Sequence, residues 1–229
     1  MAIMILAVII RWVYWVIAPE IMASDSTQFL EAAQGILHGK FTTFLVDFPF
    51  HMVYSFLLVP GYIFPDGLIW YIPLLHISSS AFTVVLIYLI SQEISQSHRA
   101  QFLAVIVAMF YPYLLFWMKF ILTDVIFTTF LTTFILLMLK LINKPNYALL
   151  TLWALVVVLL FFTRPVALLV LVVSIVVLLT VVLHKKYPSQ YVIITGVLIV
   201  FGLVAFIMLV SRPEINQKIL SIPTISQSL

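Results

Sequence analysis

The sequence predicts an all-α integral membrane protein with about seven transmembrane helices and interfacial helices in its first external loop. Hydrophobic residues make up 65% of the 229 residues and charged residues only 8%, whereas a soluble domain carries about 25% charged residues. The apolar stretches are long and continuous, which favours membrane-spanning helices. This composition excludes a soluble globular protein, a disordered tail and a nucleic-acid-binding module.

The first predicted elements are a span and a polar external loop. Residues 1–18 are apolar apart from Arg11 and lack the basic start and cleavage site of a secretory signal, so we expect a retained anchor. The first external loop covers about 19–66. Within it, the polar residues 25–27 precede an amphipathic stretch that ends at Gly39, which predicts a capped helix lying on the membrane surface.

Length divides the rest of the chain into spans. A helix of about 43 residues would extend about 64 Å, which is twice the thickness of the hydrocarbon core. The apolar stretch 100–142 is therefore expected to form two spans that turn near 119–124, and 147–183 is divided in the same way at 163–165. The other predicted segments are an interfacial stretch at 49–64, a span at 67–92, a final span at 190–210 and an external tail at 211–229.

Short basic loops set the predicted orientation. The loops 93–99, 140–146 and 184–190 are placed in the cytoplasm because they are short and contain the densest basic pair, Lys185-Lys186, although Lys and Arg are equally numerous on the two sides. Seven of the eight acidic residues, all but Glu93, then lie outside. The sequence thus predicts a single membrane domain, residues 1–229, whose polar groups gather on the extracytoplasmic face.

Charges at membrane depth are costly and therefore mark candidate functional groups. On the external face these are Asp25, Asp47 with His51, Lys119 with Asp124, and Arg164. A carboxylate in the first loop is suited to accept a proton from a hydroxyl nucleophile. Cations at the bilayer edge are suited to hold a phosphate headgroup whose lipid tail stays in the apolar core. The absence of cysteine excludes thiolate metal sites, and the sequence assigns no metal ligand and identifies no particular cofactor.

Four short motifs follow one another over about 170 residues. They are Asp25-x3-Phe29-x3-Ala33-x5-Gly39, Phe48-Pro49-Phe50-His51, Leu122-Thr123-Asp124 and Phe162-Thr163-Arg164-Pro165. Their order and spacing resemble the core of the GT-C superfamily of membrane glycosyltransferases, which includes protein O-mannosyltransferases and bacterial aminoarabinose transferases. The sequence departs from the family pattern at Phe29, where Tyr is usual, and at Asp124, where Glu is usual.

The resemblance implies transfer of a sugar from a polyprenyl-phosphate-linked donor to an acceptor at the extracytoplasmic face of a bacterial plasma membrane, with Asp25 as catalytic base. The residues expected to bind substrate are Asp124, Arg164, Lys119, His51 and Asp47. Family members commonly have further spans and an external domain. The alternative is therefore a non-catalytic subunit, or half of a split enzyme, that works with another membrane subunit. A small transporter is disfavoured because the charges gather at one face instead of at mid-membrane.

Each charged candidate also has a structural interpretation. Asp25 is placed to cap the surface helix, and Arg164 to anchor its span by reaching toward the membrane edge. Lys119 and Asp124 are suited to form an interfacial ion pair that orients the turn between two spans.

The remaining polar residues divide in the same way. Asp47 and His51 fit a solvated loop pair as well as a substrate or metal site. Arg11 is expected to pair with an acid or a carbonyl inside the helix bundle. His76, in the second span, is expected to be a hydrogen-bonded residue between helices and not a ligand.

Overall fold

The computed structural model describes residues 2–18, 21, 23, 25–39, 49–144, 146–167, 169–170, 172–176 and 196. This part of the chain is helical and contains no strand. An isolated β-bridge pairs Ile21 with Phe120 and ties the first loop to the turn before the fourth predicted span. The prediction of an all-α fold is confirmed for these residues.

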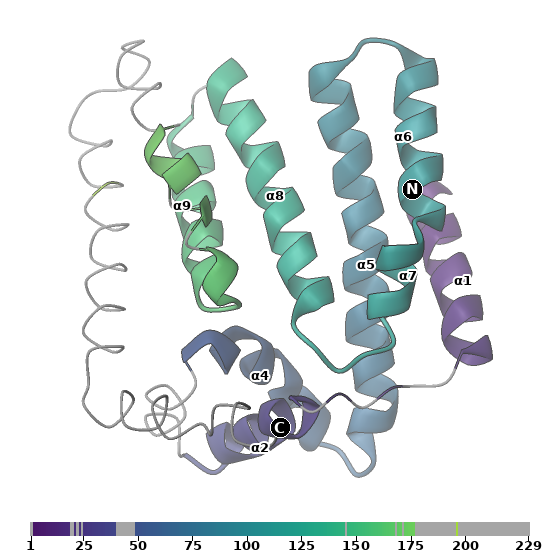
Figure 1. Cartoon of the computed structure of the whole chain (residues 1–229), viewed down its shortest axis with the longest axis vertical. Coiled ribbons are helices and arrows are strands. Elements are labelled where there is room, and N and C mark those ends of the chain that lie inside the picture. The colour runs from purple at the N-terminus through teal and green to yellow at the C-terminus, as the bar shows by residue number, and fades with distance from the viewer. Residues whose placement is uncertain are drawn as a thin grey trace, which may run out of the picture.

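The longer helices stand side by side along the long axis of the molecule (Figure 1). They are α1 (Ala2–Ile17), α5 (Gly67–Ile94), α6 (His98–Phe110), α8 (Asp124–Asn143) and α9 (Tyr147–Phe161). Helix α5 contacts α1, α6 and α8, and α8 in turn packs against α9. Helix α5 is therefore the centre of the bundle.

Two helices in the described part of the chain are long and apolar enough to cross a membrane. Helix α5 has 28 residues and α8 has 20. At 1.5 Å per residue they extend about 42 and 30 Å, and the hydrocarbon core is about 30 Å thick. Helices α1, α6 and α9 are apolar but shorter. The structure thus provides two candidate spans where the sequence predicts about seven, and the last predicted span, 190–210, lies almost wholly outside the described residues.

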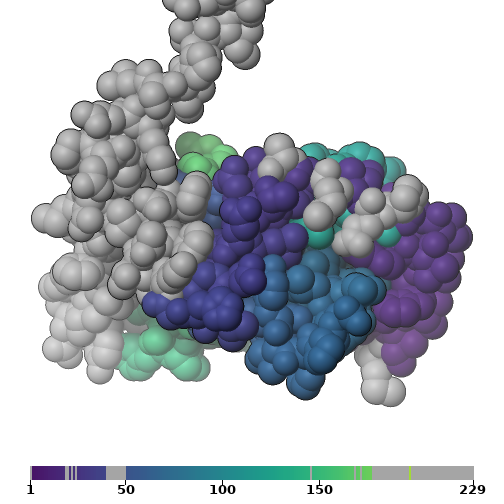
Figure 2. Space-filling view, turned by 90° about the horizontal axis from the view of Figure 1, so that it is seen from below, coloured from purple at the N-terminus to yellow at the C-terminus, as the bar shows by residue number. Residues whose placement is uncertain are grey.

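The first-loop helices lie across one end of the bundle, at the bottom of Figure 1 and facing the viewer in Figure 2. They are α2 (Ser26–Leu37), η1 (Pro49–His51), α4 (Met52–Leu58) and η2 (Val59–Tyr62). Helix α2 packs on α4 because Phe29 and Ala33, one turn apart, meet Tyr54 and Leu58 in a buried cluster. The predicted stop at Gly39 is confirmed: its φ of 78° lies in the left-handed region that glycine adopts readily.

Both long apolar stretches are broken where the sequence predicts. Helix α6 ends at Phe110, earlier than the predicted turn, because the extended backbone of Tyr111 suits a residue before proline, and α7 (Pro112–Trp117) follows. The chain then turns over 118–123 before α8 begins, and η3 (Pro165–Ala167) begins at Pro165 after α9. Both breaks lie at the end covered by α2 and α4 (Figure 1). The charged side chains beside them therefore share one end of the molecule.

The bundle is packed differently on its two sides. Helices α1, α5 and α6 meet through the buried small residues Ala7, Ala81 and Ala108, which let helix backbones approach closely. Helices α8 and α9 instead pack aromatic side chains, with the rings of Phe134 and Trp153 stacked at 5.6 Å. These contacts fix α8 and the turn after α9, which carry the candidate site.

Candidate functional site

An ion pair joins the start of α8 to the turn that follows α9. Arg164 Nη2 donates to Asp124 Oδ2 at 2.8 Å, and Arg164 Nε donates to Thr123 Oγ1 at 3.0 Å. Asp124 is the first residue of α8, a position where the helix dipole favours a carboxylate. The Arg164 N–H bonds to the carbonyl of Leu160 and so continues the last turn of α9. The arginine thereby fixes the start of α8 to the end of α9.

Burial makes this ion pair asymmetric. The Asp124 side chain is 5% exposed and the Arg164 side chain 36%. A guanidinium carries five N–H groups, and these two bonds use two of them. Within the described residues the Arg164 side chain makes no other hydrogen bond, and its guanidinium lies 6.0 Å from the Phe127 ring. The exposed side of Arg164 therefore has N–H groups that can bind an anion.

An apolar groove of about 440 Å³ is lined in part by residues that are close in sequence to the ion pair. Helix α4 forms one wall with Met52, Phe56 and neighbouring residues, while Phe130 of α8 and Phe162 after α9 contribute to the other walls. Phe162 is two residues from Arg164, and Phe130 is one turn beyond the Phe127 ring. The groove has the volume of a small-ligand pocket. Its lining suits an apolar chain.

Asp25 lies at the start of α2, exposed to solvent. The interpretation of Asp25 as a helix cap is wrong, because its side chain makes no capping hydrogen bond. The next residue, Ser26, donates its hydroxyl to the Ile121 carbonyl at 3.1 Å. This bond fastens the start of α2 to the turn that leads into Asp124. Asp25 and the Asp124–Arg164 ion pair are thus held at the same end of the bundle by a buried contact.

His51 lies at the end of η1, with its ring 4.6 Å from the ring of Phe29 on α2. Burial lowers the pKa of His51 below its ordinary value, and the negative charge of Asp25 opposes this by raising it. The structure therefore brings His51 and Asp25 within electrostatic range of each other, a pairing that the sequence did not suggest. Asp47, the predicted companion of His51, lies outside the described residues.

Lys119 is engaged elsewhere. Its side chain is buried, and Nζ donates to the Trp15 carbonyl at 2.9 Å and lies 3.9 Å from the centre of the Trp15 ring. The prediction that Lys119 pairs with Asp124 is wrong, since Arg164 forms that ion pair. The sequence suggested Lys119 because it is five residues from Asp124. The ammonium instead fastens the end of α1 to the turn before α8, which favours a structural role.

A histidine–tyrosine contact joins the surface helices to the bundle. His76 is fully buried, and its Nδ1 lies 2.9 Å from the Met118 carbonyl while its Nε2 lies 2.8 Å from the Tyr54 hydroxyl. A carbonyl only accepts, so Nδ1 carries the proton and Tyr54 donates to Nε2. The prediction that His76 is a hydrogen-bonded bundle residue is confirmed. Its partner Tyr54 was not predicted, because nothing local links residues 22 positions apart.

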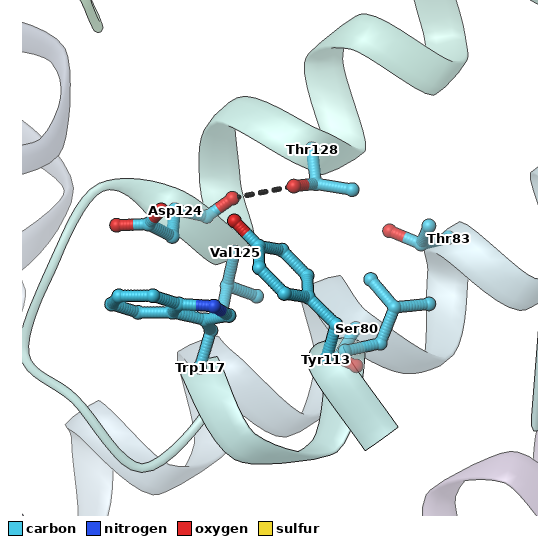
Figure 3. A pocket seen from close by; sticks show the side chains of 8 residues that line it. Ser80, Thr83, Tyr113, Trp117, Asp124, Val125 and Thr128 are labelled. Atoms are coloured by element: carbon cyan, nitrogen blue, oxygen red, sulfur yellow. Dashed lines mark hydrogen bonds between the residues drawn. The ribbon is translucent and has the colours of Figure 1, made fainter. Parts of the chain in front are cut away.

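Figure 3 shows a cavity between α5, α7 and α8, with Thr83 and Ser80 on one side and Trp117 on the other. Its volume of about 10 Å³ is enough for roughly one water and too small for a substrate. Behind it, the fully buried Arg11 donates from Nε to Ser80 Oγ at 2.7 Å and from Nη1 to the Ala7 carbonyl at 3.3 Å. The prediction of a carbonyl partner for Arg11 is confirmed.

Neither a cluster of metal-binding side chains nor similarity to known proteins assigns a function to this site. No group of three or more His, Cys, Asp or Glu side chains in the described residues is arranged to hold a metal ion. Comparison with protein-family models, curated proteins and solved structures finds no match to this chain. The resemblance of the four sequence motifs to the GT-C superfamily stays a prediction. A function for the site therefore has to be inferred from its side chains and their contacts.

Proposed function

We propose that this protein is a GT-C-like membrane glycosyltransferase that uses a polyprenyl-phosphate-linked sugar as donor. One observation carries the proposal: Arg164, a partly exposed cation at the bundle end that also holds Asp25, is two residues from Phe162, which lines an apolar groove. An amphiphile with a phosphate at one end of a long apolar chain matches both features. The four motifs with GT-C-like spacing supply the reaction class.

The residues have distinct roles in this proposal. Arg164 binds the donor phosphate, and Asp124 holds the guanidinium in place. The groove between α4 and α8 receives the part of the polyprenyl chain nearest the phosphate. Asp25, exposed at the start of α2, accepts the proton of the acceptor hydroxyl. The oxygen of that hydroxyl meanwhile bonds to the anomeric carbon of the sugar. The bond from that carbon to the phosphate oxygen breaks, and polyprenyl phosphate leaves with its negative charge paired with the Arg164 guanidinium.

The proposed topology places this site outside the cytoplasm. At the opposite end of the bundle the described charged residues are Arg99, Lys140 and Lys144 against Glu93. Basic residues in short loops favour the cytoplasmic side, so the end with α2 and α4 faces outward. In this proposal α1, α6 with α7, and α9 cross the membrane together with α5 and α8. The seven-span topology and a bacterial plasma membrane belong to the same proposal.

Variants of Asp25 and Arg164 separate catalysis from binding. Loss of a general base typically lowers the rate by about 10²–10⁴-fold, so Asp25→Asn should lose turnover at nearly unchanged donor affinity. Arg164→Ala should weaken donor binding, and turnover should fall with it. Glu31→Gln, an exposed acid on the same helix as Asp25, is the matched control and should retain both.

The assay follows a labelled sugar from a polyprenyl-phosphate hexose in membranes that contain the whole chain, with donor affinity measured separately for each variant. Full turnover in Asp25→Asn would show that Asp25 is not the base. Unchanged donor affinity in Arg164→Ala would remove the phosphate role. Turnover that appears only after a second membrane protein is added would favour the accessory or split-enzyme alternative.

A further inference from the structure

A second groove lies far from the proposed catalytic site. It has a volume of about 560 Å³ and lies between α1 and α6, near the N-terminus of the chain. Ile3 and Leu6 of α1 line it, together with Phe102, Ile106 and Phe110 of α6. These two helices make few direct contacts and meet mainly through α5. The groove is therefore an apolar space left between neighbouring helices of the bundle.

The dimensions of this groove suit a lipid chain. Its lining residues extend along α6 from His98 to Phe110, which is about 18 Å at 1.5 Å per residue. One leaflet of the hydrocarbon core is about 15 Å thick, half of the full 30 Å. Phe102 and Phe110 are more than half exposed. A single acyl chain can thus enter from the side and lie along the groove.

The polar end of the groove lies at the start of α6, next to one exposed cation, Arg99. His98, Gln101 and Tyr88 line it at the start of α6, and the exposed Arg99 lies beside them. Among the described residues Arg99 forms no ion pair. The start of α6 adds unpaired backbone N–H groups, because the side chain of Ser97 does not cap the helix. An anion at this end would meet a cation and several backbone donors together.

We propose that the groove between α1 and α6 is a binding site for an anionic phospholipid, with one acyl chain between the helices and the phosphate at Arg99 and the start of α6. Charge and length together favour this occupant: the groove is apolar, about one leaflet long, and ends beside the exposed Arg99. The site requires insertion into a membrane but not the proposed transferase activity. Its test therefore measures lipid and not turnover.

Fluorescence quenching by brominated lipids tests the proposal on the whole chain. The sequence contains no cysteine, so Ile106→Cys can place a single fluorophore in the groove. Ile9→Cys places the same fluorophore on the lipid-facing side of α1, where Ile9 is 52% exposed and does not line the groove. Each labelled protein is reconstituted in vesicles with brominated phosphatidylglycerol or brominated phosphatidylcholine. A preference of about fivefold for phosphatidylglycerol is expected at position 106, the contribution of one basic residue near the surface, and none at position 9.

Two further variants separate the groove from general surface charge. In the Ile106→Cys background, Arg99→Gln should reduce the preference to near unity, while Lys144→Gln, which removes an exposed cation at the same end, should leave it unchanged. Leu6→Trp should fill the groove and lower the preference with all charges kept. Equal quenching by the two lipids at position 106, or a preference that survives Arg99→Gln or Leu6→Trp, would overturn the proposal.

Discussion

Arg164→Ala should destabilise the protein by isolating a buried carboxylate. The Asp124 side chain is 5% exposed and accepts a 2.8 Å hydrogen bond from Arg164. Breaking a buried ion pair by removing one partner costs about 3–5 kcal/mol. Arg164 is 36% exposed, so water partly replaces it and we expect a smaller cost, about 2–3 kcal/mol. Thr123 also loses its 3.0 Å partner and contributes to this loss.

A double-mutant cycle isolates the interaction between the two side chains. Asp124→Ala with Arg164→Ala removes both charges, so the double variant should be more stable than the sum of the single effects predicts. The interaction free energy should be about 1–3 kcal/mol, the range for residues that share a hydrogen-bond network. Unfolding is followed in detergent micelles by denaturant titration, monitored by tryptophan fluorescence.

The control for this cycle is Asp66→Asn. Asp66 is exposed at the same end of the molecule and has a φ of 53°, a left-handed conformation that asparagine also adopts. Its loss of charge should therefore change the free energy of unfolding little. If the effects of Asp124→Ala and Arg164→Ala are additive, or if Arg164→Ala costs no more than Asp66→Asn, the ion pair does not hold α8 to α9 as described.

Three further outcomes are expected. Burial lowers the pKa of His51 in the folded state, so protonation of His51 favours unfolding. The stability that neutral His51 contributes is complete above pH about 6.5 and is lost as the pH falls through its folded pKa. His51→Gln should therefore flatten this part of the pH–stability curve. Lys119→Met removes the contacts with Trp15 and should cost about 1–3 kcal/mol in unfolding free energy with donor affinity unchanged. Weaker donor binding with unchanged stability would instead show that Lys119 binds the donor phosphate. Single cysteines at the exposed Thr27 and Gln96 should react with an impermeant thiol reagent from opposite sides of the membrane, and labelling from the same side would contradict the topology.

Local features of the fold could be predicted from the sequence, because they depend on near neighbours. Gly39 ends α2, Pro165 begins a new helical segment, and apolar length alone required a break before Asp124. The physical rules involved are the conformational freedom of glycine, the fixed φ of proline and the helical rise per residue. None of them needs knowledge of which helices touch.

The pairing of side chains could not be predicted, because it depends on which helix faces meet. Asp124 pairs with Arg164, 40 residues away, instead of with Lys119, which is close in sequence. Lys119 binds the Trp15 carbonyl across 104 residues. Buried polar groups take whichever partner the packing brings within reach, since leaving them unpaired is costly. The sequence therefore indicated the charged residues of the site but not their partners.

We propose that this chain transfers sugar from a lipid-linked donor, and the purified protein can be tested for that reaction. The purified, unmutated chain is reconstituted in vesicles with polyprenyl-phosphate hexose carrying a labelled sugar, and release of the label to membrane acceptors or to water is followed beside the Asp25→Asn variant. We expect release by the unmutated chain and a rate lower by about 10²-fold or more in the variant. Equal release by the two proteins would contradict it, as would no release by the unmutated chain even when total membrane protein is supplied.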